Sequence, residues 1–153
     1  MMKKLVLTLL CYLFVCASLS AENKEGFNPR DFEVTIKMMF PMKFPSKDVE
    51  PGYSIRVHND SVECHLPYIG TAYVAPIDDD GYNFDKPLSE FQVKDGKKGK
   101  KIVSFSTRKN GMEHLQFTIT VCDDSFVDVS MIPSNAESIN YSGELAIPEK
   151  KKK

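Results

Sequence analysis

The sequence predicts an all-β fold: an antiparallel meander of seven or eight strands with at most a minor helix. Short segments in which apolar and polar residues alternate follow one another along most of the chain, separated by turn residues. No stretch of 11 residues carries an apolar stripe at helical spacing. A meander of this size curls its sheet into a half-open barrel or folds into a two-sheet sandwich, and both remain open.

Residues 1–21 have the pattern of a secretory signal peptide, in which two lysines precede an apolar core and small residues follow it. The apolar run is shorter than the roughly 20 residues of a spanning helix, so we expect no transmembrane span after processing. The protein is therefore expected in the periplasm or outside the cell. Lipoprotein anchoring at Cys16 is less favoured, because two bulky residues precede this cysteine.

After the leader, residues 22–31 form a flexible polar segment, residues 32–147 a single β-rich domain, and residues 148–153 a lysine-rich tail. Loss of the leader lysines lowers the net charge from −1 to about −3. A mildly acidic chain lacks the electrostatic pattern of a nucleic-acid-binding protein, so we expect no nucleic acid as partner. The remaining lysine clusters fall in a turn and in the tail.

The first half of the domain predicts a strand followed by a hairpin. Residues 31–40 alternate, and three prolines in residues 41–52 predict an irregular connection that buries Met42 and Phe44 at the sheet edge. Asn59-Asp60 then suits a two-residue turn, because asparagine and aspartate tolerate positive φ. The resulting register places apolar partners on one side, with these pairs: Val57 with Val62, Ile55 with Cys64, and Tyr53 with Leu66.

Residues 65–76 form the longest uncharged run after the leader, with apolar residues on both alternating sets of positions. A strand of this kind is usually covered on both faces, so we expect it inside the fold, with Tyr68 and Tyr73 largely buried. Gly70 leaves room for a close neighbour. Residues 77–87, which follow, are expected to be a polar loop.

The second half predicts five further strands. Residues 88–93 form one strand, which ends at the lysine turn of residues 97–101. A hairpin follows, with a three-residue loop at residues 109–111 that pairs Phe105 with Leu115 and places Gly111 at a left-handed position. Alternating residues continue over the last strands, 127–131 and 139–145.

Few residues offer catalytic or metal chemistry. His65 and His114 fall at outward strand positions, and Cys64 points away from its neighbour His65, so the pair cannot form a dyad. No cofactor and no metal site is expected. A weak calcium site is the alternative for an acidic turn around Gly81 whose spacing breaks the calcium-loop pattern; its residues are Asp78, Asp80 and Asp85.

Two cysteines, Cys64 and Cys122, remain after the leader is removed. A disulfide is conceivable in an oxidising compartment. Alternation places Cys64 inward and Cys122 outward, so we expect no bond between them.

Aromatic and apolar residues around the central segment are the candidate binding surface: Ile69, Tyr73, Tyr82 and Phe84. The alternative is that these side chains pack the neighbouring loop onto the sheet. A small β-domain without tryptophan more naturally binds a partner than cleaves a sugar chain.

The central segment also resembles the bacterial family called domain of unknown function 4251, which is marked by a Leu-Pro-Tyr-Phe-Gly-Arg-Ala-Tyr-like motif. The matching positions are Leu66, Pro67, Tyr68, Gly70, Ala72 and Tyr73. Ile69 and Thr71 depart from the motif, standing where the family tends to carry phenylalanine and arginine. Weaker matches extend the resemblance over residues 32–145. It implies secretion and a β-rich domain, and it brings no established activity.

The interpretation that follows is an exported, non-catalytic β-domain that binds an envelope protein, peptide or glycan. Two alternatives remain open at this point. One is a small hydrolase that uses carboxylates on one sheet face, and the other is a structural envelope component without a ligand.

Overall fold

Alternating apolar residues build one long antiparallel sheet in the computed structural model, which describes residues 27–73, 81–122 and 125–146. Within these residues the helical structure is a single 3₁₀ turn at Lys97–Gly99. The all-β prediction is confirmed. The ten strands are β1 (Asp31–Pro41), β2 (Lys47–Asp48), β3 (Ser54–His58), β4 (Ser61–Leu66), β5 (Tyr82–Pro87), β6 (Ser89–Asp95), β7 (Lys101–Arg108), β8 (His114–Val121), β9 (Phe126–Pro133) and β10 (Ile139–Ala146).

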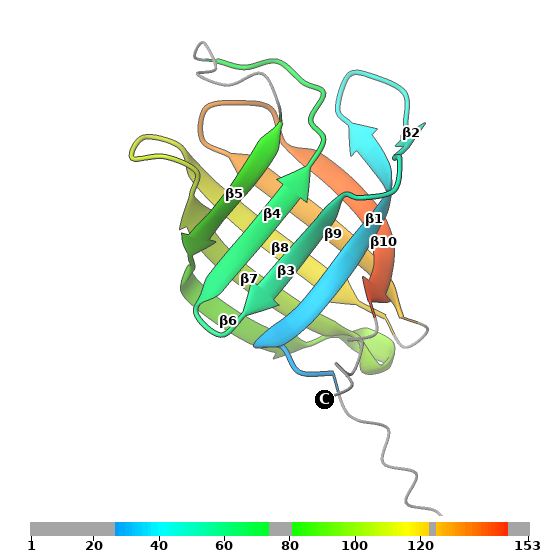
Figure 1. The fold of residues 1–153 in the computed structure, drawn as a ribbon. Helices are drawn as coiled ribbons and strands as arrows, with labels where there is room; N and C mark the ends of the chain where they lie inside the picture. The colour runs from blue at the N-terminus through cyan, green and yellow to red at the C-terminus, as the bar shows by residue number, and fades with distance from the viewer. Residues whose placement is uncertain (1–26, 74–80, 123–124, 147–153) are drawn as a thin grey trace, which may run out of the picture.

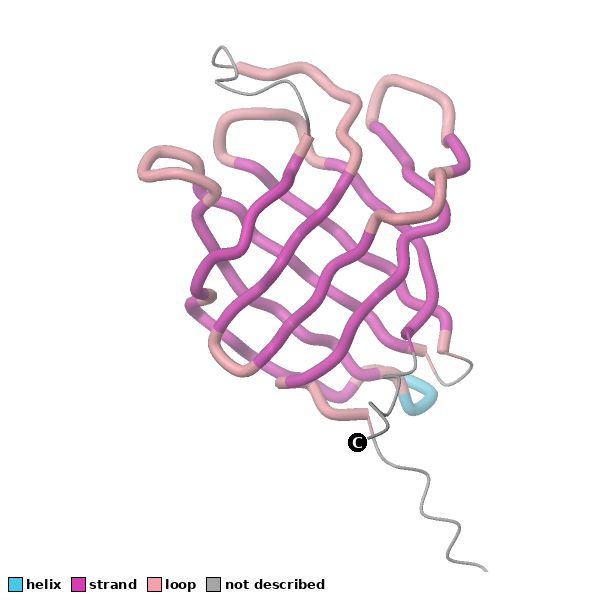
Figure 2. Tube along the Cα trace, viewed as in Figure 1, coloured by secondary structure: helices cyan, strands magenta, loops and turns pink. Residues whose placement is uncertain are grey.

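The strand order is β5-β4-β3-β1-β10-β9-β8-β7-β6, with the short β2 paired to β1. Consecutive long strands are neighbours in the sheet except β5 and β6, which lie at opposite ends of the order, and β1 pairs with β10 as well as with β3. The first and last long strands therefore pair directly. Figure 1 shows β1, β3, β4 and β5 crossing in front of the other strands, and Figure 2 shows the same two curved layers as a trace.

A bent strand nearly closes the sheet into a barrel. Only Leu88 separates β5 from β6, and β5 pairs with β4 while β6 pairs with β7 at the other end of the order. The Thr107 hydroxyl donates to the Pro87 carbonyl (2.9 Å), and Glu90 adopts φ 54° where the register shifts. Of the two expected architectures, the half-open barrel describes the molecule better than the sandwich.

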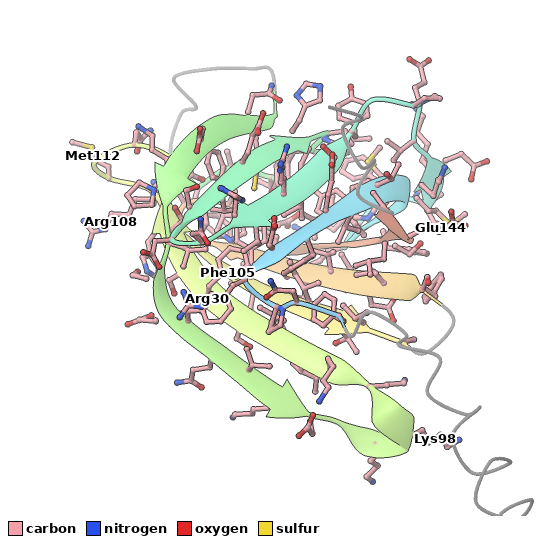
Figure 3. The ribbon with its side chains drawn as sticks, turned by 60° about the horizontal axis from the view of Figure 1, so that its bottom comes forward. Arg30, Lys98, Phe105, Arg108, Met112 and Glu144 are labelled. Carbon is pink, nitrogen blue, oxygen red and sulfur yellow. The ribbon has the colours of Figure 1, made fainter. Side chains whose placement is uncertain are left out.

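Inward-facing side chains from every long strand fill the barrel. Phe105 on β7 stacks against Phe117 on β8 with ring centroids 5.2 Å apart. Figure 3 shows Phe105 inside the curved sheet, while Arg108 and Met112 project from it. The largest fully buried side chains include Tyr141, Phe117, Ile36, Ile55, Leu66 and Leu115.

The register of the first hairpin is confirmed. Val57 pairs with Val62 and Ile55 with Cys64, and Asn59 takes φ 53° in the two-residue turn. The predicted strands over residues 127–131 and 139–145 are also present as β9 and β10.

The predicted loop over residues 77–87 is wrong from Tyr82 onward, because β5 occupies Tyr82–Pro87. Tyr82 pairs with Leu66 and Phe84 with Cys64, so both rings point inward. The alternation is short and interrupted by charged residues, which hid the strand in the sequence.

The predicted register of the β7–β8 hairpin is wrong by two residues. Phe105 pairs with Phe117, and the loop spans residues 109–113. The Asn110 side-chain oxygen accepts hydrogen bonds from the backbone N–H groups of Met112 (3.1 Å) and Glu113 (2.8 Å). These bonds satisfy the longer loop, so Gly111 has no need of the left-handed conformation.

The central segment leaves the sheet after Leu66. Residues 67–73 are irregular apart from one isolated bridge between Ala72 and Ala136, so the prediction of a strand covered on both faces is wrong here. Residues 74–76 lie outside the described part. Across the described ranges, no helix has the length and apolar character needed to cross a membrane.

Candidate binding site at the loop end of the barrel

Four connections gather at one end of the barrel because antiparallel strands place alternate turns on the same side. They are residues 42–46, 67–73, 109–113 and 134–138, seen along the upper edge of Figure 1. The central segment predicted from sequence is one of them. Its contacts with the other three determine the shape of this end.

Tyr68 folds back over Gly70 and anchors the central segment. Its hydroxyl donates to the Glu137 carbonyl (2.9 Å), and its ring meets Tyr82 edge-on at 5.3 Å between centroids. A Cβ atom on Gly70 would overlap the Tyr68 ring, whose Cζ would lie 2.7 Å away. Glycine is thus needed for a close approach, as the sequence indicated. Burial raises the pKa of Tyr68 to about 12.

A short ladder fixes residues 71–73 to residues 135–137. The Glu137 N–H donates to the Thr71 carbonyl (3.0 Å), and the Tyr73 N–H donates to the Asn135 carbonyl (2.7 Å). The Glu137 carboxylate also accepts from the Thr71 N–H (3.2 Å). The same glutamate therefore binds the central segment through both its backbone and its side chain.

Lys43 links a third loop to this ladder through an ion pair with Glu137, with Nζ 2.5 Å from Oε1. The Glu137 side chain is only 6% exposed, whereas Lys43 is 65% exposed. The hydrogen bond from Lys43, followed by that from Thr71, lowers the pKa of Glu137 below its usual value. The hydrogen bond to Glu137 raises the pKa of Lys43. Both shifts favour the charged pair.

We expect this pair to make stability depend on acid pH. Because the folded state lowers the pKa of Glu137, its contribution is present above the ordinary pKa of 4.5 and is lost as pH falls through the folded value. Thermal melts of the wild type and of Glu137→Gln are recorded from about pH 7 down to about pH 3. The difference between their melting temperatures should therefore shrink as the pH becomes acid. Lys43→Met should reproduce part of the effect, since Lys43 is the first cause of the shift. Curves for Glu137→Gln and the wild type that stay parallel would contradict the prediction.

Buried tyrosines hold the loop end from inside. The Tyr141 hydroxyl donates to the Pro67 carbonyl (2.7 Å), and the Tyr82 hydroxyl donates to the Glu113 carboxylate (3.0 Å). Lys109 donates to the Gly81 carbonyl (3.0 Å) and lies 5.0 Å from the centre of the Tyr82 ring. Burial raises the pKa of both phenols, Tyr82 and Tyr141. They therefore act as neutral donors.

The four residues expected to form a binding surface do not come together on the outside. Tyr82 is buried at 4% exposure, and Ile69 and Phe84 are partly buried against the core. Tyr73 is 68% exposed, which contradicts its expected burial. The separation follows from β5, whose alternation turns Tyr82 and Phe84 inward.

Two further side chains at this end, Met42 and Phe44, are exposed although their burial at the sheet edge was expected. Met42 is 68% exposed and Phe44 51% exposed, which corrects their expected burial. The Ser138 hydroxyl lies 3.2 Å from the Met42 sulfur, and Tyr73 is close enough to Lys43 to raise its pKa. Met42 and Phe44 flank Lys43 in the chain, and Tyr73 lies close to its charge. These three exposed side chains are here called the rim patch. The proline-flanked Met-Lys-Phe sequence at residues 41–45 was the available signal.

The described residues provide little for metal or thiol chemistry. No group of three or more histidine, cysteine, aspartate or glutamate residues among them is placed to hold a metal ion. Asp85 lies on β5 opposite Glu63, while Asp78 and Asp80 fall outside the described part. Cys64 and Cys122 are free thiols, and burial raises the pKa of Cys64.

Comparisons with known proteins give a family and a fold. A family model described as domain of unknown function (DUF4251) matches residues 17–145. A search of curated proteins finds no match. A crystal structure of a DUF4251 family protein from Bacteroides eggerthii superposes with a TM-score of 0.59 at 18% identity, covering 76% of this chain and 79% of that one. At this identity the likeness concerns the fold alone.

Proposed function

The chain belongs to the DUF4251 family, a family of unknown function, and we propose that it is an exported, non-catalytic domain that binds an envelope protein or peptide through the rim patch. The observation that carries this proposal is the exposure of Met42, Phe44 and Tyr73 on loops that are held in place. Large apolar side chains that stay exposed on a fixed framework are typical of protein-binding surfaces.

The charges at this end support binding over hydrolysis. A carboxylate-dependent hydrolase needs two carboxyl groups that are free to face a substrate. Glu137 is occupied by Lys43 and Thr71, and Glu113 accepts the Tyr82 hydroxyl. Both carboxylates serve the framework that positions the patch, which favours the binding interpretation.

Serine at all three patch positions should abolish partner capture and leave the fold intact. The side chains are exposed, so the melting temperature should change little, while the apolar contact is lost. A photo-crosslinking residue at position 73 in the native bacterium should give a defined adduct that the Met42→Ser/Phe44→Ser variant loses. The same crosslinker at His58, at the opposite end of β3, is the control. Identical adducts from both positions, or an adduct unaffected by the serine changes, would refute the proposal.

Export supplies the second test. If residues 1–21 are a signal peptide, the protein recovered from the periplasm should begin at Ala21 or Glu22, as read from its intact mass. A diacylglyceryl-modified Cys16 would place the protein on a membrane anchor, and a full-length cytoplasmic form would remove the export proposal altogether.

A further inference from the structure

The outer face of the curved back layer carries a continuous row of short, uncharged polar side chains. Cross-strand pairing aligns them over β6, β7, β8, β9 and β10, and β1 adds an exposed phenylalanine at the end. We call this set the polar row. Its members, in order across the strands, are Gln92, Ser104, Thr118, Ser130 and Asn140, followed by Phe40. Five interstrand spacings of about 4.8 Å give the row a length of roughly 24 Å.

The hydrogen-bonding groups of this row are available to a ligand. Within the described residues, none of the five polar side chains has a hydrogen-bond partner in the protein. Beside the row, Ser142 is only 7% exposed and its hydroxyl has no such partner either. It lies on the same face, between Met38 and Asp128. Because no buried side-chain polar atom of the described residues lacks a partner, the Ser142 hydroxyl is open to solvent and within reach of a ligand on this face.

The outer face of the opposite layer differs from the polar row in its charge. Its corresponding row runs across β1, β3, β4 and β5 and consists of Glu33, Arg56, Glu63 and Asp85. Charged residues make up 27% of the sequence, yet the polar row has none. Short hydroxyl side chains also lose less rotamer entropy on binding than lysine, arginine or glutamate.

Two open hollows lie along the row and share Thr118. One, of about 420 Å³, is bordered by Gln92, Ser104 and Thr118, and the other, of about 480 Å³, by Thr118, Ser130 and Phe40. Both volumes lie within the roughly 300–1,000 Å³ of small-molecule sites. Each has one carboxylate at its margin, Glu90 in the first and Asp128 in the second.

We propose that this face binds a neutral glycan lying across the strands. Hydroxyl and amide groups can donate to and accept from sugar hydroxyls, and the exposed ring of Phe40 (39%) can stack on the apolar side of a sugar. The absence of charge from the row matches an uncharged ligand. A peptide strand would pair with a sheet edge rather than lie across a face. This surface is separate from the rim patch.

Affinity electrophoresis of the purified protein in native gels tests the proposal. The probes are dextran, laminarin, galactomannan and yeast mannan, with polygalacturonate as the acidic comparison. At least one neutral polysaccharide should retard the wild type. Thr118→Arg, which puts a long cation where the hollows meet, should lower the affinity about tenfold or more, and Phe40→Ala should also weaken it. Asp85→Arg adds the same side chain to the opposite face and should retain full binding.

Melting temperatures of all variants should match the wild type, since the changed residues are exposed on strand faces. No retardation by any neutral polysaccharide, retardation by polygalacturonate alone, or equal retardation of Thr118→Arg would overturn the proposal. So would a dimer that Thr118→Arg dissociates, because the face would then be an interface between two copies. Loss of the rim patch should leave retardation unchanged, which separates this site from the proposed protein-binding surface.

Discussion

Replacing Gly143 by alanine is expected to destabilise the protein by about 3 kcal/mol, the upper range for forcing extra volume into a packed site. Gly143 lies on β10 beside the register shift of β1. A Cβ atom there would overlap the Thr35 carbonyl oxygen and lie 2.9 Å from the Thr35 carbonyl carbon. Backbone cannot rotate away as a side chain can, so the two strands must separate locally.

Gly111→Ala is the matched control for this change. Nothing lies within 4 Å of a Cβ atom at that loop position, so its stability should stay close to the wild type. Urea denaturation gives both values, provided that the slope of the transition is unchanged. A Gly143→Ala variant as stable as Gly111→Ala would mean that β1 and β10 do not approach as closely as described.

Tyr141→Ala should cost about 3–5 kcal/mol, the range for truncating a large aromatic side chain in a core. Tyr141 is 1% exposed, and its hydroxyl holds the Pro67 carbonyl at the start of the central segment. The alanine variant therefore loses both the packing of the ring and one anchor of the loop end.

Tyr141→Phe separates these contributions, because it keeps the ring and removes only the hydroxyl. It should cost about 1 kcal/mol and increase hydrogen exchange mainly in residues 67–73. If both variants lose the same stability, the hydroxyl rather than the ring would be the dominant contribution, contrary to this expectation.

The sequence predicted best those strands in which alternation and turn chemistry agreed. Val57 and Val62 could be paired because only one register buries all apolar residues around Asn59-Asp60. The prediction of the β7–β8 loop was wrong because the Asn110 side-chain oxygen accepts two backbone hydrogen bonds, which support a loop of five residues where the glycine suggested three. The turn propensity of asparagine reflects such bonds, but it does not fix the length of the loop.

The loop end was only partly predictable. The motif around Tyr68 and Gly70 marked the right segment, but its runs of apolar residues suggested a strand. What fixes it instead is Glu137, far away in the sequence, together with Lys43. A single sequence gives no signal that pairs these residues. The polar row was equally hidden, since each strand contributes only one of its members and the row exists only across the sheet.

The pairing of β1 with β10 has a consequence for how the chain folds. One edge of β1, near the start of the domain, is covered only by β10, the last strand. This part of the sheet therefore forms late in folding. Topologies dominated by such distant pairings fold slowly, on the order of milliseconds to seconds. During synthesis, β1 and β3 exist as an incomplete layer with an unpaired edge until residue 146 has emerged. The newly made chain thus keeps an open sheet edge for as long as its end is missing, and unpaired edges of this kind make partly folded chains prone to aggregation.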